Sequence, residues 1–149
     1  MIGIIGAMDE EVEQMVQVME VEKEEVKASM TFKAGKLAGK EVVIVRSGIG
    51  KVNAAVCTQI LVDDFGVDYV INTGSAGGLH EEANIGDVVI STGTLYHDVD
   101  VTGFNYAYGQ VPGMPAIYES NVSLVKKVES ILDKIGKNYW LGTIGTGDS

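Results

Sequence analysis

The sequence predicts an α/β sandwich, in which helices cover a mostly parallel β-sheet. Short apolar segments with the length of buried strands alternate along the chain with longer segments of helical periodicity. Two of the strand segments end in glycine-rich turns, at residues 47–51 and 73–78. With 149 residues, of which 46% are hydrophobic, the chain fits one domain and can bury a sizeable core.

Each predicted element rests on a local pattern. Apolar runs bounded by turn residues predict strands at residues 1–6, 29–37, 41–46, 68–72, 87–91 and 139–144. Helical spacing of apolar residues predicts helices at residues 8–20, 50–65 and 121–135, the second of them ended by Gly66. The apolar stripe of the first helix consists of Met8, Val12, Met15, Val16 and Met19. A loop rich in Gly, Tyr and Pro is expected from about residue 93 to residue 118.

Charge and cysteine content exclude several classes of protein. The net charge is −10 and Arg46 is the single arginine, so the basic face that a nucleic-acid binder needs is absent. Much of the negative charge lies between residues 9 and 25, and we interpret most of these acids as the solvated face of a helix. Cys57 is the only cysteine and is expected to pack in the core. No apolar run is long enough to span a membrane and no basic leader is visible, so we expect a cytoplasmic protein with no membrane contact.

The two glycine-rich turns do not match known phosphate-binding patterns. In the first turn, Asn53 stands where a dinucleotide-binding fingerprint requires Gly or Ala. A phosphate-binding loop is excluded there because Val52, rather than Ser or Thr, follows Lys51. The second turn fits neither pattern. Both turns are therefore either tight connections or the edge of a ligand site at the carboxyl ends of the strands.

Five stretches, taken together and in order, carry a resemblance to a known family. They are IIGAMDEE at residues 4–11, SGIGKVNAA at 47–55, NTGSAGGL at 72–79, YHDVDVT at 96–102 and YGQVPG at 108–113. The chain closely resembles the 5'-methylthioadenosine/S-adenosylhomocysteine nucleosidases of the purine nucleoside phosphorylase-like superfamily. The resemblance implies a three-layer α/β/α sandwich with a central mixed sheet, and hydrolysis of the N-glycosidic bond of these adenine nucleosides. It also implies a homodimer that needs no metal and no organic cofactor.

The same resemblance implies roles for individual residues. Glu11 is expected to activate the attacking water, and Ser75 to help hold that water. The residues expected to contact the substrate within one subunit are Met8, Ile49, Ser75, Ala76 and Gly77. Three more, Val101, Phe104 and Pro112, match the segment that closes over the site of the partner subunit.

The chemistry of the reaction supports a carboxylate in the first helix without identifying which one. Breaking an N-glycosidic bond builds positive charge on the sugar, and a nearby carboxylate stabilises this charge while deprotonating water. Helical periodicity directs Glu10 away from the apolar stripe and places Asp9 and Glu11 on its two sides. Periodicity leaves these two open, and the resemblance selects Glu11. An ordinary solvated helix carboxylate is the other interpretation of Glu11.

Charge also separates water from phosphate as the attacking group. A phosphorylase holds phosphate near the sugar with Arg or Lys, and the first strand-to-helix turn carries only acids. Only Arg46 and Lys51 lie near the end of a strand, so we expect a neutral nucleoside and a hydrolase. A nucleoside phosphorylase and a non-catalytic nucleoside-binding module are the alternatives. The residues His97, Asp98 and Asp100 form no metal site in this interpretation, because alternation along a strand would leave too few convergent ligands.

The chain departs from the family in one respect. The later part of the family sequence carries a Met-Glu pair that grips the ribose hydroxyls and a Ser-Asp motif whose Asp protonates adenine. Residues 1–149 contain neither of these features. We therefore expect a single nucleoside phosphorylase-like domain that is incomplete at its C-terminus and nearly inactive alone, because general acid catalysis contributes about 10²–10⁴ in rate.

Overall fold

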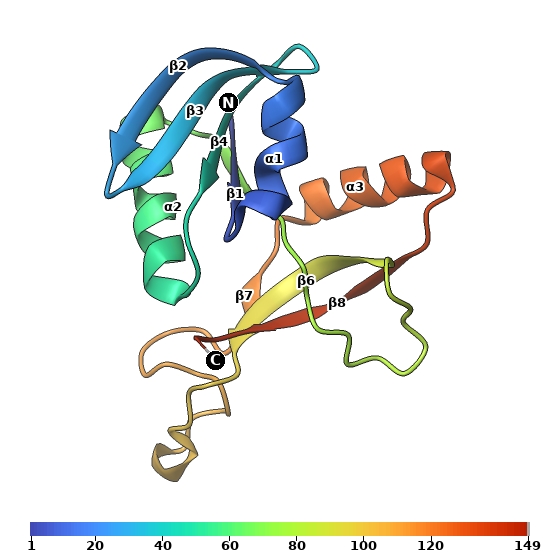
Figure 1. The fold of residues 1–149 in the computed structure, drawn as a ribbon. Coiled ribbons are helices and arrows are strands. Elements are labelled where there is room, and N and C mark those ends of the chain that lie inside the picture. Colours follow the sequence, from blue (N-terminus) through green and yellow to red (C-terminus); the bar gives the residue numbers. More distant parts are fainter. Residues whose placement is uncertain (149) are drawn as a thin grey trace. The chain divides into compact units, whose positions relative to one another are not determined.

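The computed structural model describes residues 1–148, which fall into two compact units divided between Ala76 and Gly77 (Figure 1). Unit 1 contains residues 1–76, and unit 2 contains the described residues from Gly77 onward. Each unit has its own β-sheet and its own helices. The two units are described separately below.

The sheet of unit 1 is mixed. Its strands are β1 (Ile2–Gly6), β2 (Glu20–Lys27), β3 (Met30–Leu37), β4 (Lys40–Arg46) and β5 (Tyr69–Asn72), in the spatial order β2-β3-β4-β1-β5. The central strand β1 pairs in parallel with β4 and β5, whereas β2, β3 and β4 pair antiparallel. The prediction of a mostly parallel sheet is wrong for this unit, and the mixed sheet implied by the family is confirmed.

Two tight turns explain the antiparallel half of this sheet. Ala28 and Ser29 connect β2 to β3, and Ala38 and Gly39 connect β3 to β4, with positive φ at all four residues. Two-residue turns with this backbone conformation match the twist of an antiparallel hairpin. A connection of two residues is too short for the crossover that parallel strands require.

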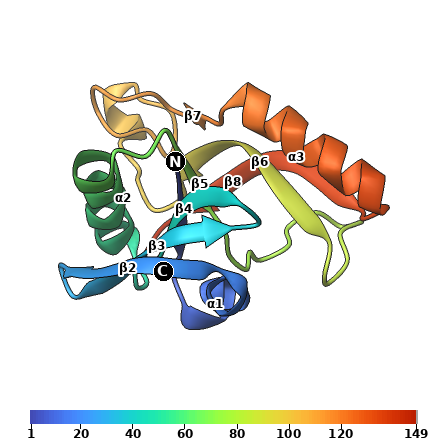
Figure 2. The same ribbon diagram turned by 90° about the horizontal axis from the view of Figure 1, so that it is seen from above.

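Helices α1 (Asp9–Val18) and α2 (Lys51–Phe65) cover opposite faces of this sheet, so that unit 1 has three layers (Figures 1 and 2). Successive residues of a strand point to opposite faces. Ile4 accordingly packs with Val12 of α1, and Ile5 packs with Cys57 and Leu61 of α2. The predicted α/β/α sandwich is therefore built around β1.

Helix α2 packs closely on the sheet through Cys57 and Leu61, and both side chains are fully buried. A Cβ atom on Gly3 would lie 2.9 Å from Leu61 Cδ1, so the missing side chain at Gly3 allows this approach. Burial raises the pKa of the Cys57 thiol to about 11, and the prediction that Cys57 is a core residue is confirmed. Gly66 ends α2 in the left-handed conformation, as predicted. Among residues 1–148, no helix combines the length and the apolar character needed to cross a membrane.

The acidic segment of residues 9–25 does not lie on one helix, and the prediction is wrong for its second half. Helix α1 ends at Val18, and Met19 turns into the core. The remaining acids lie on β2, which is an edge strand of the sheet. Lys33 and Lys36 of β3 pair with acids of β2 at 3.5 and 3.9 Å. An edge strand tolerates charge on both faces and is protected by it from further strand pairing, which accounts for a sequence that lacks a clear strand alternation.

Unit 2 contains a second, smaller sheet with the order β7-β6-β8. Its strands are β6 (Val88–Tyr96), β7 (Tyr118–Glu119) and β8 (Tyr139–Thr146). Strand β6 pairs in parallel with β8 and antiparallel with β7. The predicted strands at 87–91 and 139–144 are confirmed, but β6 continues past a bulge between Ser91 and Gly93 and ends at Tyr96. The loop therefore begins later than predicted, and the short β7 at its end was not predicted.

The helix of unit 2, α3 (Val122–Ile135), packs against β6 and confirms the predicted helix at residues 121–135. Asn121 caps its N-terminus, because its side-chain oxygen accepts a hydrogen bond from Leu124 N at 3.0 Å. Gly136 ends the helix in the left-handed conformation. A short 3₁₀ helix, η1 (Thr102–Phe104), lies in the long loop and was not predicted.

We predict that Leu61→Ala lowers the free energy of unfolding by about 2–5 kcal/mol, because it leaves a cavity between α2 and the sheet. Val62, the next residue of the helix, is 48% exposed, and Val62→Ala should cost less than about 1 kcal/mol. Chemical denaturation followed by far-UV circular dichroism measures both values. Equal losses for the two variants would contradict the packing described for α2.

Candidate active site

Glu11 lies in the first turn of α1, just beyond the carboxyl end of the central strand β1. Its side chain turns back toward the start of the helix. Glu11 Oε2 accepts hydrogen bonds from the backbone N–H groups of Ala7 at 2.7 Å and Met8 at 3.1 Å. The first amides of a helix have no partners within the helix and carry partial positive charge, so a carboxylate is favoured there.

The second oxygen of the same carboxylate binds the glycine-rich turn after β5. Glu11 Oε1 accepts a hydrogen bond from Ser75 N at 3.0 Å, and Ser75 Oγ lies 3.5 Å from the same oxygen. Ser75 is 64 residues away in the sequence, and the parallel pairing of β1 with β5 brings the ends of the two strands together. Three backbone N–H groups from two segments thus hold one carboxylate. We call the N–H groups of Ala7, Met8 and Ser75 the amide cradle.

The amide cradle keeps the carboxylate ionised. Partial burial is the largest single influence on the pKa of Glu11 and raises it. The hydrogen bonds from Ser75, Met8 and Ala7 act in the opposite direction, and their sum holds the pKa of Glu11 below its usual value. Glu11 is therefore a charged, positioned group at neutral pH.

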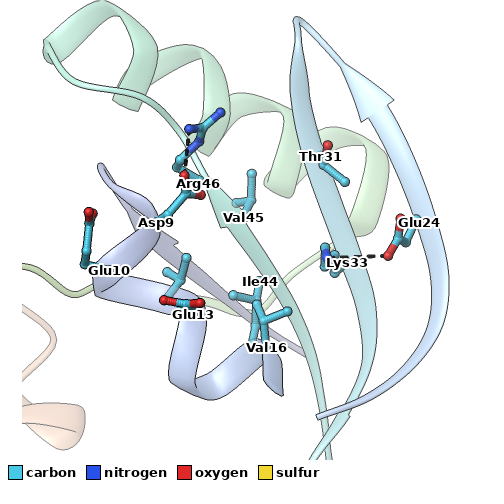
Figure 3. Close-up of a pocket in the computed structure, with 11 residues that line it drawn as sticks. Asp9, Glu10, Glu13, Val16, Glu24, Thr31, Lys33, Ile44, Val45 and Arg46 are labelled. Atoms are coloured by element: carbon cyan, nitrogen blue, oxygen red, sulfur yellow. Dashed lines mark hydrogen bonds and ion pairs between the residues drawn. The ribbon is translucent and has the colours of Figure 1, made fainter. Parts of the chain in front are cut away.

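The other two acids at the start of α1 have different surroundings. Asp9 forms an ion pair with Arg46 of β4 at 3.0 Å. Glu10 and Asp9 both border a groove of about 630 Å³ beside β3 and β4, whereas Glu11 does not line it (Figure 3). Helical periodicity left Asp9 and Glu11 open, and the structure brings Glu11 alone of the three to Ser75.

The groove shown in Figure 3 is lined by four carboxylates and two cations, and each cation is paired with one of the carboxylates. Arg46 pairs with Asp9, and Lys33 pairs with Glu24 at 3.5 Å. These are the two cations in its lining. Each cation already has a carboxylate beside it, so the groove does not resemble a phosphate site, where a cation faces the ligand.

The first glycine-rich turn, between β4 and α2, is fastened by a side chain. Asn53 Nδ2 donates to the carbonyl of Ile49 at 2.8 Å, and Gly48 and Gly50 supply positive φ values. This bond explains why Asn occupies the position where a dinucleotide fingerprint has a small residue. The side chain of Ile49 is left 72% exposed.

The predicted residues of unit 1 are thus arranged around strand ends. Ser47 N donates to Gly6 O at 2.9 Å, which joins the first glycine-rich turn to the end of β1. Met8, the residue before α1, is exposed at this edge together with Ile49. Ala76 is also exposed and follows Ser75 directly. Met8, Ile49 and Ala76 are thus the exposed apolar residues among the predicted site residues of unit 1.

The remaining predicted residues belong to unit 2. Gly77, the first residue of unit 2, is exposed. Val101 precedes η1 and is half-buried. Phe104, at the end of η1, is 79% exposed, and Pro112 is exposed in a turn further along. An exposed aromatic side chain on a long loop suits contact with a ligand or a partner chain.

The prediction that His97 and Asp98 lie on a strand is wrong. Strand β6 ends at Tyr96, so His97 and Asp98 lie in the following loop, where the alternation of a strand does not apply. The loop has its own hydrogen bonds. Tyr108 Oη donates to the carbonyl of His97 at 2.8 Å, and Asp100 accepts bonds from the amide and hydroxyl of Thr102 at 3.1 and 2.7 Å.

The amide cradle was the functional feature that sequence patterns missed. Backbone N–H groups have no residue-type signature, and a glutamate at the third position of a helix usually signals a capping box only when Ser or Thr precedes the helix. Here Met8 stands at that position. The available signal was a glutamate in the first helical turn combined with a second glycine-rich turn on a neighbouring parallel strand.

Comparison with known proteins gives one family and a consistent set of relatives. Residues 1–149 match the family model described as the phosphorylase superfamily. The chain is 50% identical over 149 residues to the 5'-methylthioadenosine/S-adenosylhomocysteine nucleosidase of Bacillus subtilis (strain 168), and the match covers 99% of this chain and 64% of the relative. The Bacillus licheniformis nucleosidase of the same name is 52% identical, with the same coverage. The chain thus spans about two-thirds (64%) of the length of these curated relatives.

Solved structures of nucleosidases share this fold. The Neisseria meningitidis 5'-methylthioadenosine/S-adenosylhomocysteine nucleosidase, solved in complex with methylthio-immucillin-A, superposes with a TM-score of 0.95 at 45% identity. That match covers 99% of this chain and 64% of the other. The Colwellia psychrerythraea 34H enzyme, solved in complex with adenine, gives a TM-score of 0.93 at 45% identity, with 99% and 62% coverage.

We predict that Glu11→Gln lowers the free energy of unfolding at pH 7 by about 1–2 kcal/mol, because a carboxamide cannot accept at both ends of the amide cradle. The folded-state pKa of Glu11 is lowered, so the stabilisation is fully present above the unfolded pKa and is lost as pH falls through the folded pKa. The difference between the two proteins should therefore shrink as pH falls below about 4. Chemical denaturation at a series of pH values measures it.

Glu10→Gln is the matched control, because it removes one charge from the same helical turn and Glu10 is exposed. Its effect should stay within about 0.5 kcal/mol at every pH. A Glu11→Gln variant as stable as Glu10→Gln at pH 7 would contradict the hydrogen bonds described here.

Proposed function

Because this chain belongs to the phosphorylase superfamily, we propose that it forms the part of a hydrolase that carries the water-activating carboxylate. The proposed reaction cleaves the N-glycosidic bond of 5'-methylthioadenosine and S-adenosylhomocysteine, giving adenine and the thioribose product. The observation that carries the proposal is the ionised Glu11 side chain, fixed at the carboxyl ends of β1 and β5 by three backbone N–H groups. The nucleosidase relatives provide the substrate class.

The hydrogen bonds of Glu11 leave room for a water molecule. Each carboxylate oxygen accepts about two hydrogen bonds. Oε2 has both positions filled by Ala7 and Met8, whereas Oε1 has one short bond, from Ser75 N. Ser75 Oγ, at 3.5 Å, is long for a hydrogen bond but close enough to share a water with Oε1. We assign the remaining position of Oε1 to the attacking water.

The carboxylate then acts in two ways. As the bond between the sugar carbon and the adenine nitrogen breaks, positive charge develops on the sugar, and the fixed negative charge of Glu11 stabilises it. As the water oxygen bonds to that carbon, one water proton passes to Glu11, and adenine leaves with the electron pair of the broken bond. The proton that adenine takes up would come from the acid that the resemblance places in the later part of the family sequence. A lowered pKa keeps Glu11 charged before this moment, and the growing positive charge of the sugar drives the proton transfer.

The remaining predicted residues complete the proposal. Met8 and Ile49 contact the substrate, and the backbone of Ser75, Ala76 and Gly77 approaches the nucleoside. The half-buried Val101 and the exposed Phe104 and Pro112 reach the site of the partner subunit in a homodimer. The reaction uses no metal and no organic cofactor, and the protein is cytoplasmic in this proposal.

A phosphorylase is the alternative within the same superfamily, and the charges of unit 1 oppose it. A phosphate dianion would compete for the amide cradle, which the Glu11 carboxylate already fills. Arg46 is committed to Asp9, and Lys33 to Glu24. Two negative groups at one cradle repel each other, whereas neutral water does not.

We predict that Glu11→Gln lowers the rate of adenine release by about 10²–10⁴, because it removes the proton acceptor and the negative charge together. The protein for this test joins residues 1–149 to the segment of the Bacillus subtilis nucleosidase that the chain does not match. Liquid chromatography of adenine after incubation with methylthioadenosine measures the rate. Glu10→Gln should retain activity within a few-fold, and an active Glu11→Gln enzyme would exclude Glu11 as the base.

Titration calorimetry of residues 1–149 with methylthioadenosine distinguishes the third possibility, a non-catalytic binding module, from the hydrolase. If methylthioadenosine binds but neither residues 1–149 nor the joined protein releases adenine, the binding module is favoured over the hydrolase. Absence of binding and of release would remove both.

We also predict that the rate of adenine release is the same with and without inorganic phosphate, because water is the attacking group. The sugar product should carry no phosphate, which ³¹P NMR of the reaction mixture measures directly. A rate that rises with phosphate, together with a sugar 1-phosphate signal, would establish phosphorolysis instead.

A further inference from the structure

Gly74, the residue before Ser75, lies directly against the Glu11 carboxylate. A Cβ atom built on Gly74 would be 2.7 Å from Glu11 Oε1 and 3.1 Å from Glu11 Cδ. Contacts below 3.0 Å do not occur for real Cβ atoms, so one of the two groups would have to move. Gly74 does not have a positive φ. The position therefore requires glycine for space rather than for backbone conformation.

The other two glycines of this segment do not share this requirement. A Cβ atom on Gly77 or Gly78 would meet nothing within 4 Å, and neither residue has a positive φ. Glycine-rich composition alone therefore does not explain Gly74. Its missing side chain is matched to one particular neighbour.

The carboxylate is the end of a flexible side chain, but its other contacts hold it in place. Its other oxygen, Oε2, is held by Ala7 and Met8. On the strand side, a Cβ atom on Gly6 would lie 3.0 Å from Glu11 Cβ and 2.7 Å from Val12 Cγ1, so the base of the side chain is also tightly packed. Oε1 is both the atom that a methyl group at residue 74 would contact and the atom that accepts from Ser75 N, so we expect its displacement to lengthen that bond.

We propose that Gly74 is a positioning residue, whose lack of a side chain lets the Glu11 carboxylate reach the Ser75 amide. The contact between Gly74, Glu11 and Ser75 lies within unit 1, and only its consequence for catalysis rests on the proposed function. Substitution at residue 74 should disturb two properties of Glu11. The pKa of Glu11 should rise toward its usual value as a lowering hydrogen bond is lost. The attacking water, held by Oε1, should be misplaced.

The first experiment measures Glu11 itself and does not depend on activity. Residues 1–149 are prepared with ¹³C-labelled glutamate, and the carboxyl signals are titrated by NMR, with the Glu11 signal assigned from its absence in Glu11→Gln. Gly74→Ala should raise the pKa of Glu11, and Gly78→Ala, the matched control, should leave it unchanged. An unchanged Glu11 pKa in Gly74→Ala would overturn the proposal.

A double-mutant cycle measures the same contact through stability, and it can be used even if Gly74→Ala folds poorly. The stability cost of Gly74→Ala should be smaller when Glu11 is also replaced by Ala, because the clashing group is then gone. An equal cost in the two backgrounds would overturn the proposal, and so would a failure of both the single and the double variant to fold.

The second experiment tests the catalytic consequence in the joined protein used for adenine release. Gly74→Ala should lower kcat by about 10–10², with KM changed by less than a few-fold, because the reacting water rather than the nucleoside is displaced. Gly78→Ala should change neither. Absence of adenine release by the unsubstituted protein would contradict the proposed function and leave the NMR result to decide on Gly74. Normal kcat in Gly74→Ala with a raised Glu11 pKa would overturn the catalytic part.

Discussion

The site of unit 1 depends on one interaction, the binding of the Glu11 carboxylate by backbone N–H groups from two separate segments. Ala7 and Met8 contribute the unpaired amides of a helix start, and Ser75 contributes an amide from the turn after β5. A side-chain anion in this position satisfies donors that would otherwise need water. The bond to Ser75 also links the first helix to a strand end 64 residues away.

The rest of unit 1 makes this interaction possible by placing β1 between β4 and β5. Parallel pairing aligns the carboxyl ends of the three strands, and their connections leave the sheet on one edge. The two helices bury alternate residues of β1, which fixes the height of the strand relative to α1. A small shift of β1 along its neighbours would separate Glu11 from Ser75. The core is therefore a condition for the site, although the hydrogen bonds to the carboxylate described above come from outside the core.

The sequence was informative where a residue type has one common use. The apolar stripe of Val12, Met15 and Val16 predicted α1, and Gly66 predicted the end of α2. Residue types did not predict β2, because its acids continue the acidic start of α1 without a break in composition. They also left Asp9 and Glu11 open, because helical spacing gives the direction of a side chain but not the backbone groups it meets. Gly74 and the neighbouring Gly78 look alike in the sequence, and only the contact with Oε1 distinguishes them.

The occupied amide cradle gives a physical reason why hydrolysis and phosphorolysis exclude each other at such a site. Helix starts and glycine-rich turns attract anions, and in many proteins the anion is a phosphate group of the ligand. Here the chain supplies the anion itself, through Glu11. An internal carboxylate loses little entropy on binding, whereas a free phosphate must be captured from solution and would face a negative charge. If the proposed function holds, exchange of this one side chain for a neutral or basic residue should reopen the cradle to phosphate, and the charge at residue 11 rather than the fold would set the attacking group.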